Sequence, residues 1–175
     1  MSGDKTLIQI VDAALAEAAR KSGPWLVCRA GCTECCMGPF PITQLDARRL
    51  REGLAELESR DLERAARVRE RARQAAAETA TDDDPCPALD PETGTCDLYA
   101  ARPITCRIFG PPVRRGSEAV GVCELCFQGA SDREIADCGV EIDPRGLESR
   151  LSDELERTTG ARGQTIVAFA LLAAQ

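Results

Sequence analysis

The sequence predicts a mainly α fold with a small, irregular, cysteine-rich region that contains a short β-hairpin. Three observations lead to this prediction. Apolar residues recur with helical spacing near both ends of the chain, the central stretch is rich in Pro and Gly, and ten cysteines occur with no histidine. A chain of 175 residues suits one domain over residues 1–175, with the cysteine-rich region over residues 25–126 flanked by N- and C-terminal helices.

The two ends of the chain are expected to be helical. Residues 6–21 carry apolar side chains on one helical face, and the breaker Gly23-Pro24 follows them. The tail from about Leu147 to Ala174 has the pattern of one or two helices, interrupted near Gly160 to Gly163.

Two further helices are expected before the central cysteines. Thr43, with Asp46 three residues later, is typical of a helix N-cap and predicts a helix to about Leu57. Asp61 is expected to cap a third helix that runs to about Glu78. We interpret this Arg- and Ala-rich helix as solvated with one narrow packed stripe, rather than as a basic docking surface. The expected stripe is Leu62, Ala65, Ala66, Val68 and Ala72.

Turn chemistry dominates the stretch after the third helix. Asp90-Pro91-Glu92-Thr93-Gly94 combines a Pro, which fixes one turn position, with a Gly that accepts positive φ. We expect a small hairpin there, with Cys86 on one arm and Cys96 on the other. Gly110-Pro111-Pro112 is a second breaker.

Composition excludes several function classes. Without histidine the chain has no Ser-His-Asp triad, no Cys-His nucleophile pair, and no histidine to ligate zinc or haem. The net charge of −7 argues against nucleic acid as a partner, because phosphate contacts need a basic surface.

The sequence points to the cytoplasm. The N-terminal stretch lacks the pattern of a secretory signal, and the most apolar run, residues 165–174, is too short to span a bilayer. Thiols stay reduced in the cytoplasm, so ten cysteines favour metal ligation over a disulfide framework.

The strongest motif is a group of four cysteines within nine residues, with the spacing C-x3-C-x2-C-C. Its members are Cys28, Cys32, Cys35 and Cys36. Zinc takes four thiolates, and so does a cubane iron–sulfur cluster. Side chains of neighbouring residues leave the backbone in different directions. Cys35 and Cys36 are therefore expected either to ligate two separate metals or to include one residue that ligates none. Two four-thiolate sites would use eight of the ten cysteines.

The remaining cysteines fall into two groups. Cys138 stands alone and is interpreted as a small buried apolar residue. The other five are candidate ligands, three of them in turn-rich sequence and two with the spacing of a metal knuckle, of which at least one is expected to ligate. They are Cys86, Cys96, Cys106, Cys123 and Cys126.

Three sequence blocks resemble the YkgJ-like cysteine-cluster family, CxxCxxCC, described as a zinc- or iron-chelating domain. The first is Cys28-Arg-Ala-Gly-Cys32-Thr-Glu-Cys35-Cys36, and the second is Cys86-Pro-Ala-Leu followed by Gly94-Thr-Cys96-Asp-Leu-Tyr99. The third is Arg102-Pro103-Ile-Thr-Cys106-Arg107-Ile-Phe109. The resemblance implies a metal site of zinc or an iron–sulfur cluster, with Cys123 or Cys126 as the eighth cysteine. Some relatives are labelled oxidoreductases, and a flagellin lysine methylase has a similar cluster.

Several other residues flank these blocks. Arginines beside ligand positions could offset thiolate charge or donate hydrogen bonds to sulfur, although Arg102 and Arg107 could equally pair with nearby acids. They are Arg29, Arg102 and Arg107. Glu34, Asp97 and Tyr99 are the nearby acid–base candidates, and Tyr99 is expected to pack in the core with a tethered hydroxyl.

Three functions follow, and the sequence leaves open whether the protein is an enzyme. The favoured one is an iron–sulfur protein, with a 4Fe-4S cluster, that serves a redox or electron-transfer role on a protein partner. The second is a structural zinc module for protein interaction, whose metal replaces part of a thin hydrophobic core. The third is an enzyme that modifies a protein or peptide, by analogy with the methylase. Neither nucleic acid nor a membrane is expected as a partner.

Overall fold

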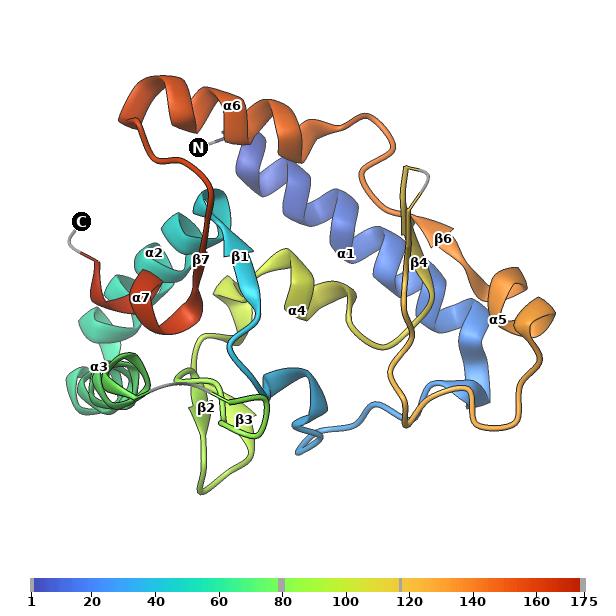
Figure 1. The fold of residues 1–175 in the computed structure, drawn as a ribbon, viewed down its shortest axis with the longest axis horizontal. Helices are drawn as coiled ribbons and strands as arrows, with labels where there is room; N and C mark the ends of the chain where they lie inside the picture. The colour runs from blue at the N-terminus through green and yellow to red at the C-terminus, as the bar shows by residue number, and fades with distance from the viewer. Residues whose placement is uncertain (1, 79–80, 117, 174–175) are drawn as a thin grey trace. The chain divides into compact units, whose positions relative to one another are not determined.

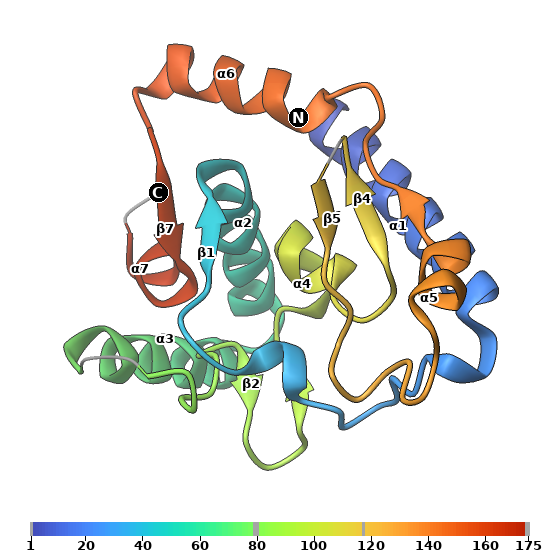
Figure 2. The same cartoon turned by 45° about the vertical axis from the view of Figure 1, so that its right-hand side comes forward.

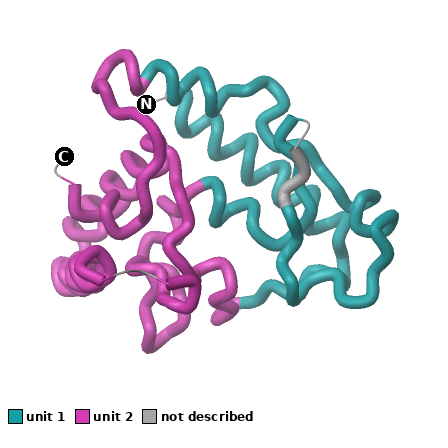
Figure 3. The backbone as a smooth tube through the Cα atoms, in the orientation of Figure 1, with its two compact units in different colours: residues 1–29, 104–154 teal, residues 30–103, 155–175 magenta. Residues whose placement is uncertain are grey.

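The computed structural model describes residues 2–78, 81–116 and 118–173. The chain divides into two compact units, drawn in teal and magenta in Figure 3. Unit 1 comprises Met1–Arg29 and Ile104–Glu154, and unit 2 comprises Ala30–Pro103 and Leu155–Gln175. The single domain over residues 1–175 stays a prediction.

Unit 1 is built around the N-terminal helix α1, Ser2–Ser22, which contacts α4, α5 and β6. The ribbons of Figures 1 and 2 show α4 and α5 beside it. In a three-stranded sheet, β4 pairs antiparallel with β5 and parallel with β6. The bounds are α4 Ile104–Ile108, β4 Val113–Arg115, β5 Glu118–Val120, α5 Asp132–Cys138, β6 Val140–Glu141 and α6 Leu147–Thr159.

The first helix confirms the helical pattern and extends it by one turn at its N-terminal end. Leu7, Val11 and Ala18 are buried along one face, as the 3–4 residue spacing requires. Ser22 is also buried, and its hydroxyl donates to the Ala18 carbonyl at 2.7 Å. The helix then gives way to a short 3-10 turn, η1, Gly23–Trp25, at the predicted breaker.

Unit 2 is a three-helix layer, α2, α3 and α7, with a two-stranded ribbon in which β1 pairs antiparallel with β7. Its buried core is built from small and aliphatic side chains of these helices and of the segments that carry the cysteines. The bounds are η2 Glu34–Cys36, β1 Pro41–Thr43, α2 Gln44–Arg60, α3 Leu62–Ala77, β2 Leu89–Asp90, β3 Thr95–Cys96, η3 Tyr99–Ala101, β7 Gln164–Ile166 and α7 Val167–Leu172.

Both predicted helix caps of unit 2 are present. The Thr43 side chain accepts from the Asp46 amide at the start of α2, and the Asp61 carboxylate accepts from the Arg64 amide at the start of α3. The packed stripe of α3 is narrower than expected, because only Ala65, Val68 and Ala72 are buried. Leu62 is exposed at the first position of the helix, and Ala66 lies about 100° around the helix from Ala65.

The hairpin is confirmed, with one correction. Strands β2 and β3 pair across the Asp90–Gly94 turn, and Cys96 lies on the second strand. Cys86 is not on the first strand: it precedes β2 by three residues, because its backbone amide is bonded to another segment.

The tail is interrupted at the expected place. Helix α6 ends at Thr159, and β7 then leads into α7. The predicted end of the tail, Ala174, lies outside the described residues. No helix in the described ranges is both long and apolar enough to cross a membrane.

Candidate metal centre

The ten cysteines divide equally between the two units, and all ten lie in the described part of the chain, where no disulfide bond joins any two of them. Unit 2 holds Cys32, Cys35, Cys36, Cys86 and Cys96. Unit 1 holds Cys28, Cys106, Cys123, Cys126 and Cys138. The first cysteine of the C-x3-C-x2-C-C motif therefore belongs to unit 1, and its later cysteines belong to unit 2.

In unit 2, backbone hydrogen bonds bring the vicinal cysteines to Cys86. The Cys86 amide donates to the Cys36 carbonyl at 2.7 Å. The next residues, Met37 and Pro85, form an antiparallel bridge, and the Gly38 amide donates to Asp84 at 2.8 Å. Two segments about fifty residues apart in sequence are thus paired next to the cysteines.

The hairpin brings Cys96 to the same region. Leu89 is paired with Cys96 across the two strands, and the Asp97 amide donates to the Ala88 carbonyl at 2.8 Å. The hairpin turn lies against the loop that carries Cys32, since a Cβ on Gly94 would be 3.6 Å from the Cα of Gly31. Gly94 has φ of 64°, which favours glycine at this turn.

The vicinal thiols do not diverge as expected. The Sγ atoms of Cys35 and Cys36 are 4.0 Å apart, because both residues lie in the short turn η2. Two thiolates on one tetrahedral zinc ion are about 3.8 Å apart, given Zn–S bonds of ~2.3 Å. The two neighbours are therefore placed well for a common ion.

These thiols also interact electrostatically with Cys86 and Cys96. A hydrogen bond from Cys36 lowers the pKa of Cys35 to about 6, and the same bond, together with burial, raises the pKa of Cys36. Negative charge on Cys86 or Cys96 raises the pKa of Cys36 further, so four thiols of unit 2 share one electrostatic environment.

Backbone amides point at two of these sulfurs. The amides of Ala88 and Leu89 donate to the Cys86 sulfur, and the amide of Leu98 donates to the Cys96 sulfur. Such donors stabilise thiolates and tune metal–sulfur sites. Burial outweighs them, raising the pKa of Cys86 to about 11 and that of Cys96 above its usual range.

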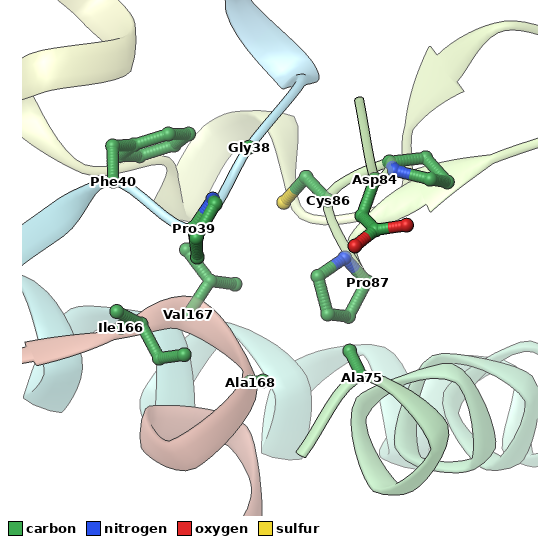
Figure 4. Close-up of a pocket in the computed structure, with 11 residues that line it drawn as sticks. Gly38, Pro39, Phe40, Ala75, Asp84, Cys86, Pro87, Ile166, Val167 and Ala168 are labelled. Carbon is green, nitrogen blue, oxygen red and sulfur yellow. The ribbon is translucent and has the colours of Figure 1, made fainter. Parts of the chain in front are cut away.

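Cys86 lines an apolar surface pocket of unit 2 (Figure 4). The close-up places the Cys86 sulfur between the two proline-containing segments of the pocket wall. The wall comprises Gly38, Pro39, Phe40, Ala75, Asp84, Pro85, Pro87, Ile166, Val167 and Ala168.

The charge of Arg102 acts on two thiols of unit 2. Its positive charge helps to lower the pKa of Cys35 and opposes the rise at Cys96. The guanidinium carbon is 3.7 Å from the centre of the Tyr99 ring. The expectation that Tyr99 packs in the core is wrong, because 64% of its surface is exposed; the ring contacts the arginine instead.

The other acid–base candidates of unit 2 differ sharply. The Asp97 side chain is 1% exposed, and its two oxygens pair with Arg64 and Arg71 of α3, so its role is to fix the hairpin to that helix. Arg71 also donates to the Pro87 carbonyl at 2.9 Å. Glu34 is exposed, and its charge opposes ionisation of the adjacent Cys35.

In unit 1, Gly110 lies between two of the cysteine segments. A Cβ at this position would be 3.2 Å from the Cys28 Sγ, and the Gly110 carbonyl accepts from the Cys123 amide at 3.2 Å. The φ of Gly110 is 118°, which only glycine adopts readily. The breaker signal marked this position, but not its approach to a thiol.

Cys123 and Cys126 lie in a buried apolar cluster. The Cys126 amide donates to the Cys123 carbonyl at 2.9 Å, and the amides of Leu125 and Cys126 donate to the Cys123 sulfur. Burial raises the pKa of Cys123. Next to them, Phe127 stacks on Trp25 with ring centres 6.4 Å apart, and its amide donates to the Trp25 carbonyl.

The remaining flanking residues of unit 1 have separate environments. Cys106 lies half-buried in α4, and the adjacent Arg107 is buried and pairs with Asp12 at 2.7 Å. The Cys138 thiol is buried and donates to the Lys21 carbonyl at 3.3 Å. Arg29 is exposed.

Among the described residues, no three Cys, Asp or Glu side chains converge as the ligands of one metal ion. The structure brings Cys35, Cys36, Cys86 and Cys96 into one region of unit 2, and Cys28 and Cys123 to either side of Gly110 in unit 1. Ligation by the nine candidate cysteines stays a prediction.

Comparison with known proteins gives one match. No curated protein and no solved structure matches the chain. A family model does match residues 27–126, more than half of the chain, and it is that of CxxCxxCC, described as "putative zinc- or iron-chelating domain". The matched stretch includes every candidate ligand and the Cys86–Cys96 hairpin. The chain belongs to the CxxCxxCC family of cysteine-rich, zinc- or iron-chelating domains.

Proposed function

We propose that the chain is an iron–sulfur protein, with a cubane cluster held in unit 2 by Cys35, Cys36, Cys86 and Cys96. The observation that carries the proposal is the backbone pairing that brings the segments of Cys36, Cys86 and Cys96 together. Four is the number of thiolates that a cubane takes, one on each iron, so the sulfurs of Cys35 and Cys36 would have to move apart to bind it. Cys32, on the loop next to the hairpin turn, is a further candidate in the same unit.

The surroundings of these thiols suit a metal–thiolate site. Amides that donate to Cys86 and Cys96, together with the positive charge of Arg102, favour sulfur in its ionised form. Burial disfavours ionised thiols unless a cation balances them, and it raises the pKa of Cys86 and Cys96. A bound iron–sulfur cluster would supply one-electron redox chemistry.

Unit 1 offers a second set of four thiols. Cys28 and Cys123 lie on either side of Gly110, Cys126 accompanies Cys123, and Cys106 belongs to the same unit. We propose these four as a second site, with Cys138 excluded because its thiol already donates to a backbone carbonyl. This division uses eight of the ten cysteines.

The proposed role is electron transfer or redox chemistry on a protein partner in the cytoplasm. A reducing compartment keeps ten thiols available as ligands. Tyr99 is exposed three residues after Cys96, and the half-buried Arg102 packs on its ring, so this surface of unit 2 is a candidate point for an electron to enter or leave.

The test is anaerobic purification followed by iron, sulfide and zinc analysis and an absorbance spectrum. We expect a brown protein with broad visible absorbance and about four irons per cubane. Cys86→Ser and Cys96→Ser should each lower the iron content, whereas Cys138→Ser should not. Wild-type iron content in both of the first two variants would refute the ligand assignment.

A structural zinc site is the second candidate, and the core of unit 2 favours it. Small side chains make up much of this core, including Ala47, Ala65, Ala72 and Ala170. A structural zinc site can contribute about 10–16 kcal/mol in small peptides, which would compensate for limited apolar burial. A colourless protein with stoichiometric zinc would replace the iron–sulfur proposal with this one.

A further inference from the structure

Phe127 has a backbone conformation that is unusual for its residue type. Its φ is 59°, in the left-handed region that glycine adopts readily and bulky residues avoid. Among the described residues, the other non-glycine with a positive φ is Asp143, whose carboxylate accepts from the Leu147 amide at the start of α6. Aspartate tolerates this region, and its role there is to satisfy a helix start. Because strain of this kind persists only where the surroundings enforce it, Phe127 needs an explanation of its own.

Trp25 holds both the ring and the amide of Phe127. The two rings stack with centres 6.4 Å apart and planes inclined by 15°. The Phe127 amide donates to the Trp25 carbonyl at 3.1 Å, and the Phe127 side chain is buried. The angle φ describes the rotation between an amide and the side chain of the same residue, so a change of φ would break one of these two contacts. The pair of contacts therefore fixes the left-handed conformation.

These contacts join segments that carry three cysteines of unit 1. Phe127 directly follows Cys126, and its partner tryptophan lies three residues before Cys28. The turn from Cys123 to Cys126 is held at its other end by Gly110, whose carbonyl accepts from the Cys123 amide at 3.2 Å. A Cβ on Gly110 would also be 3.2 Å from the Cys28 sulfur. Both ends of the turn are thus attached to groups close to Cys28 in sequence or in space.

We propose that Phe127 is a positioning residue, whose left-handed backbone keeps the Cys123–Cys126 turn against the Cys28 segment before a metal is bound. This inference rests on the second site of the proposed function. Relaxation of Phe127 to a negative φ would redirect the chain at one end of the turn. The apparent dissociation constant of a metal rises as the competent fraction of the chain falls, so this relaxation would weaken binding. Phe127 itself ligates nothing.

The test measures where zinc binds in the reduced, metal-free, full-length chain. Zn²⁺, which accepts thiolate ligands, is added at buffered free concentrations, and a brief pulse of a maleimide then alkylates the unprotected thiols. Mass spectrometry of the peptides reports each cysteine separately. Cys28 is exposed, so its alkylation reports protection by metal in unit 1. Cys86 of unit 2 is the internal control in every Phe127 variant, where its protection should not change.

Phe127→Leu should raise the free Zn²⁺ concentration that half-protects Cys28 about tenfold, because leucine cannot stack on Trp25 and does not favour a positive φ. Phe127→Gly should raise it by at most about threefold, since glycine adopts this φ without strain and loses only the ring. Phe127→Tyr should match the wild type. Phe169→Leu makes the same change at an exposed position of α7 in unit 2 and is the matched control, with no effect expected at Cys28.

The order of the leucine and glycine variants separates positioning from packing. Apolar packing alone predicts the greater loss for glycine, because leucine keeps an apolar side chain and glycine keeps none. That reverse order, or a wild-type midpoint in Phe127→Leu, would overturn the inference alone. If Phe127→Leu does not fold, the glycine and tyrosine variants decide, and a gap beyond about threefold between them overturns the inference.

The wild-type protein separates this inference from the proposed function. If Cys28 stays unprotected, the second site fails and the inference fails with it, whereas protection of Cys86 decides the site of unit 2 independently. Cys126 is buried, so the metal-free chain should be alkylated there far more slowly than in urea. Equal rates would mean that nothing holds the turn before metal binds, and only the inference would fail.

Discussion

The two units hold their cysteines in different ways. In unit 2, backbone pairing and a buried carboxylate fix the segments that carry the thiols, and charged groups surround them. In unit 1, the segments that carry the thiols are held by the close approach at Gly110 and by the stacked rings of Trp25 and Phe127. Cys123 and Cys126 lie among apolar side chains there. The difference teaches that one short motif can supply thiols to two environments, one in which charged side chains act on buried thiols and one in which apolar side chains enclose them.

The largest effect is expected from the buried carboxylate of unit 2. Asp97→Ala would leave Arg64 and Arg71 without their shared anion and would release the hairpin from α3. We expect a loss of about 3 kcal/mol in the free energy of unfolding, at the low end for a broken buried ion pair because both arginines are partly exposed. Urea denaturation followed by circular dichroism measures it.

Glu58→Ala is the control for this variant, because Glu58 pairs with Arg69 at the surface of the same unit. It should cost at most about 1 kcal/mol. Equal losses in the two variants would show that the buried pair does not hold unit 2 together in the way described.

An intermediate effect is expected from the glycine of unit 1. Gly110→Ala forces an unfavourable φ and places a Cβ against the Cys28 sulfur, so it should cost about 1–3 kcal/mol and lower the metal content. Gly116 also has a positive φ, but open space surrounds it. Gly116→Ala should therefore leave the metal content unchanged. Metal loss in both variants, or in neither, would contradict a specific role for the Cys28 contact.

The metal content of single cysteine variants sharpens the comparison further. Cys35→Ser and Cys106→Ser remove one proposed ligand from unit 2 and one from unit 1. Each should lower the metal content of the purified protein and its thermal stability together. Elemental analysis and a melting curve measure both quantities, and full metal content in both variants would remove these two residues from the ligand set.

The smallest effect is expected at Cys138. Cys138→Ala removes the thiol that donates to the Lys21 carbonyl, so it should cost about 0.5–1.5 kcal/mol with no loss of metal. Chemical denaturation and elemental analysis of the same sample give the two values. Loss of a stoichiometric share of metal would instead place Cys138 among the ligands.

Local signals predicted much of the fold. The caps at Thr43 and Asp61 and the hairpin turn at Asp90–Gly94 depend on residues within a few positions of one another, and all three are present. The pairing of Cys36 with Cys86 spans fifty residues, so no local pattern indicated it. It also explains why Cys86 lies outside the hairpin.

The candidate site was predicted by residue type but not by arrangement. Cysteine spacing marked the thiols, whereas the position of Tyr99 depends on the packing of Ala101 against Gly53, which no spacing rule contains. Asp97 likewise has the residue type of an acid–base candidate, but two arginines of α3, a helix distant in sequence, pair with its carboxylate.

The aromatic residues beside the two cysteine groups make the units optically distinguishable. The chain has one tryptophan and one tyrosine. Trp25 stacks on Phe127, next to Cys126 in unit 1, and Tyr99 follows Cys96 by three residues in unit 2. Indole can be excited at wavelengths that phenol does not absorb, so quenching of its emission would follow events next to Trp25 in unit 1. Metal loading of unit 1 can therefore be followed in an unlabelled sample.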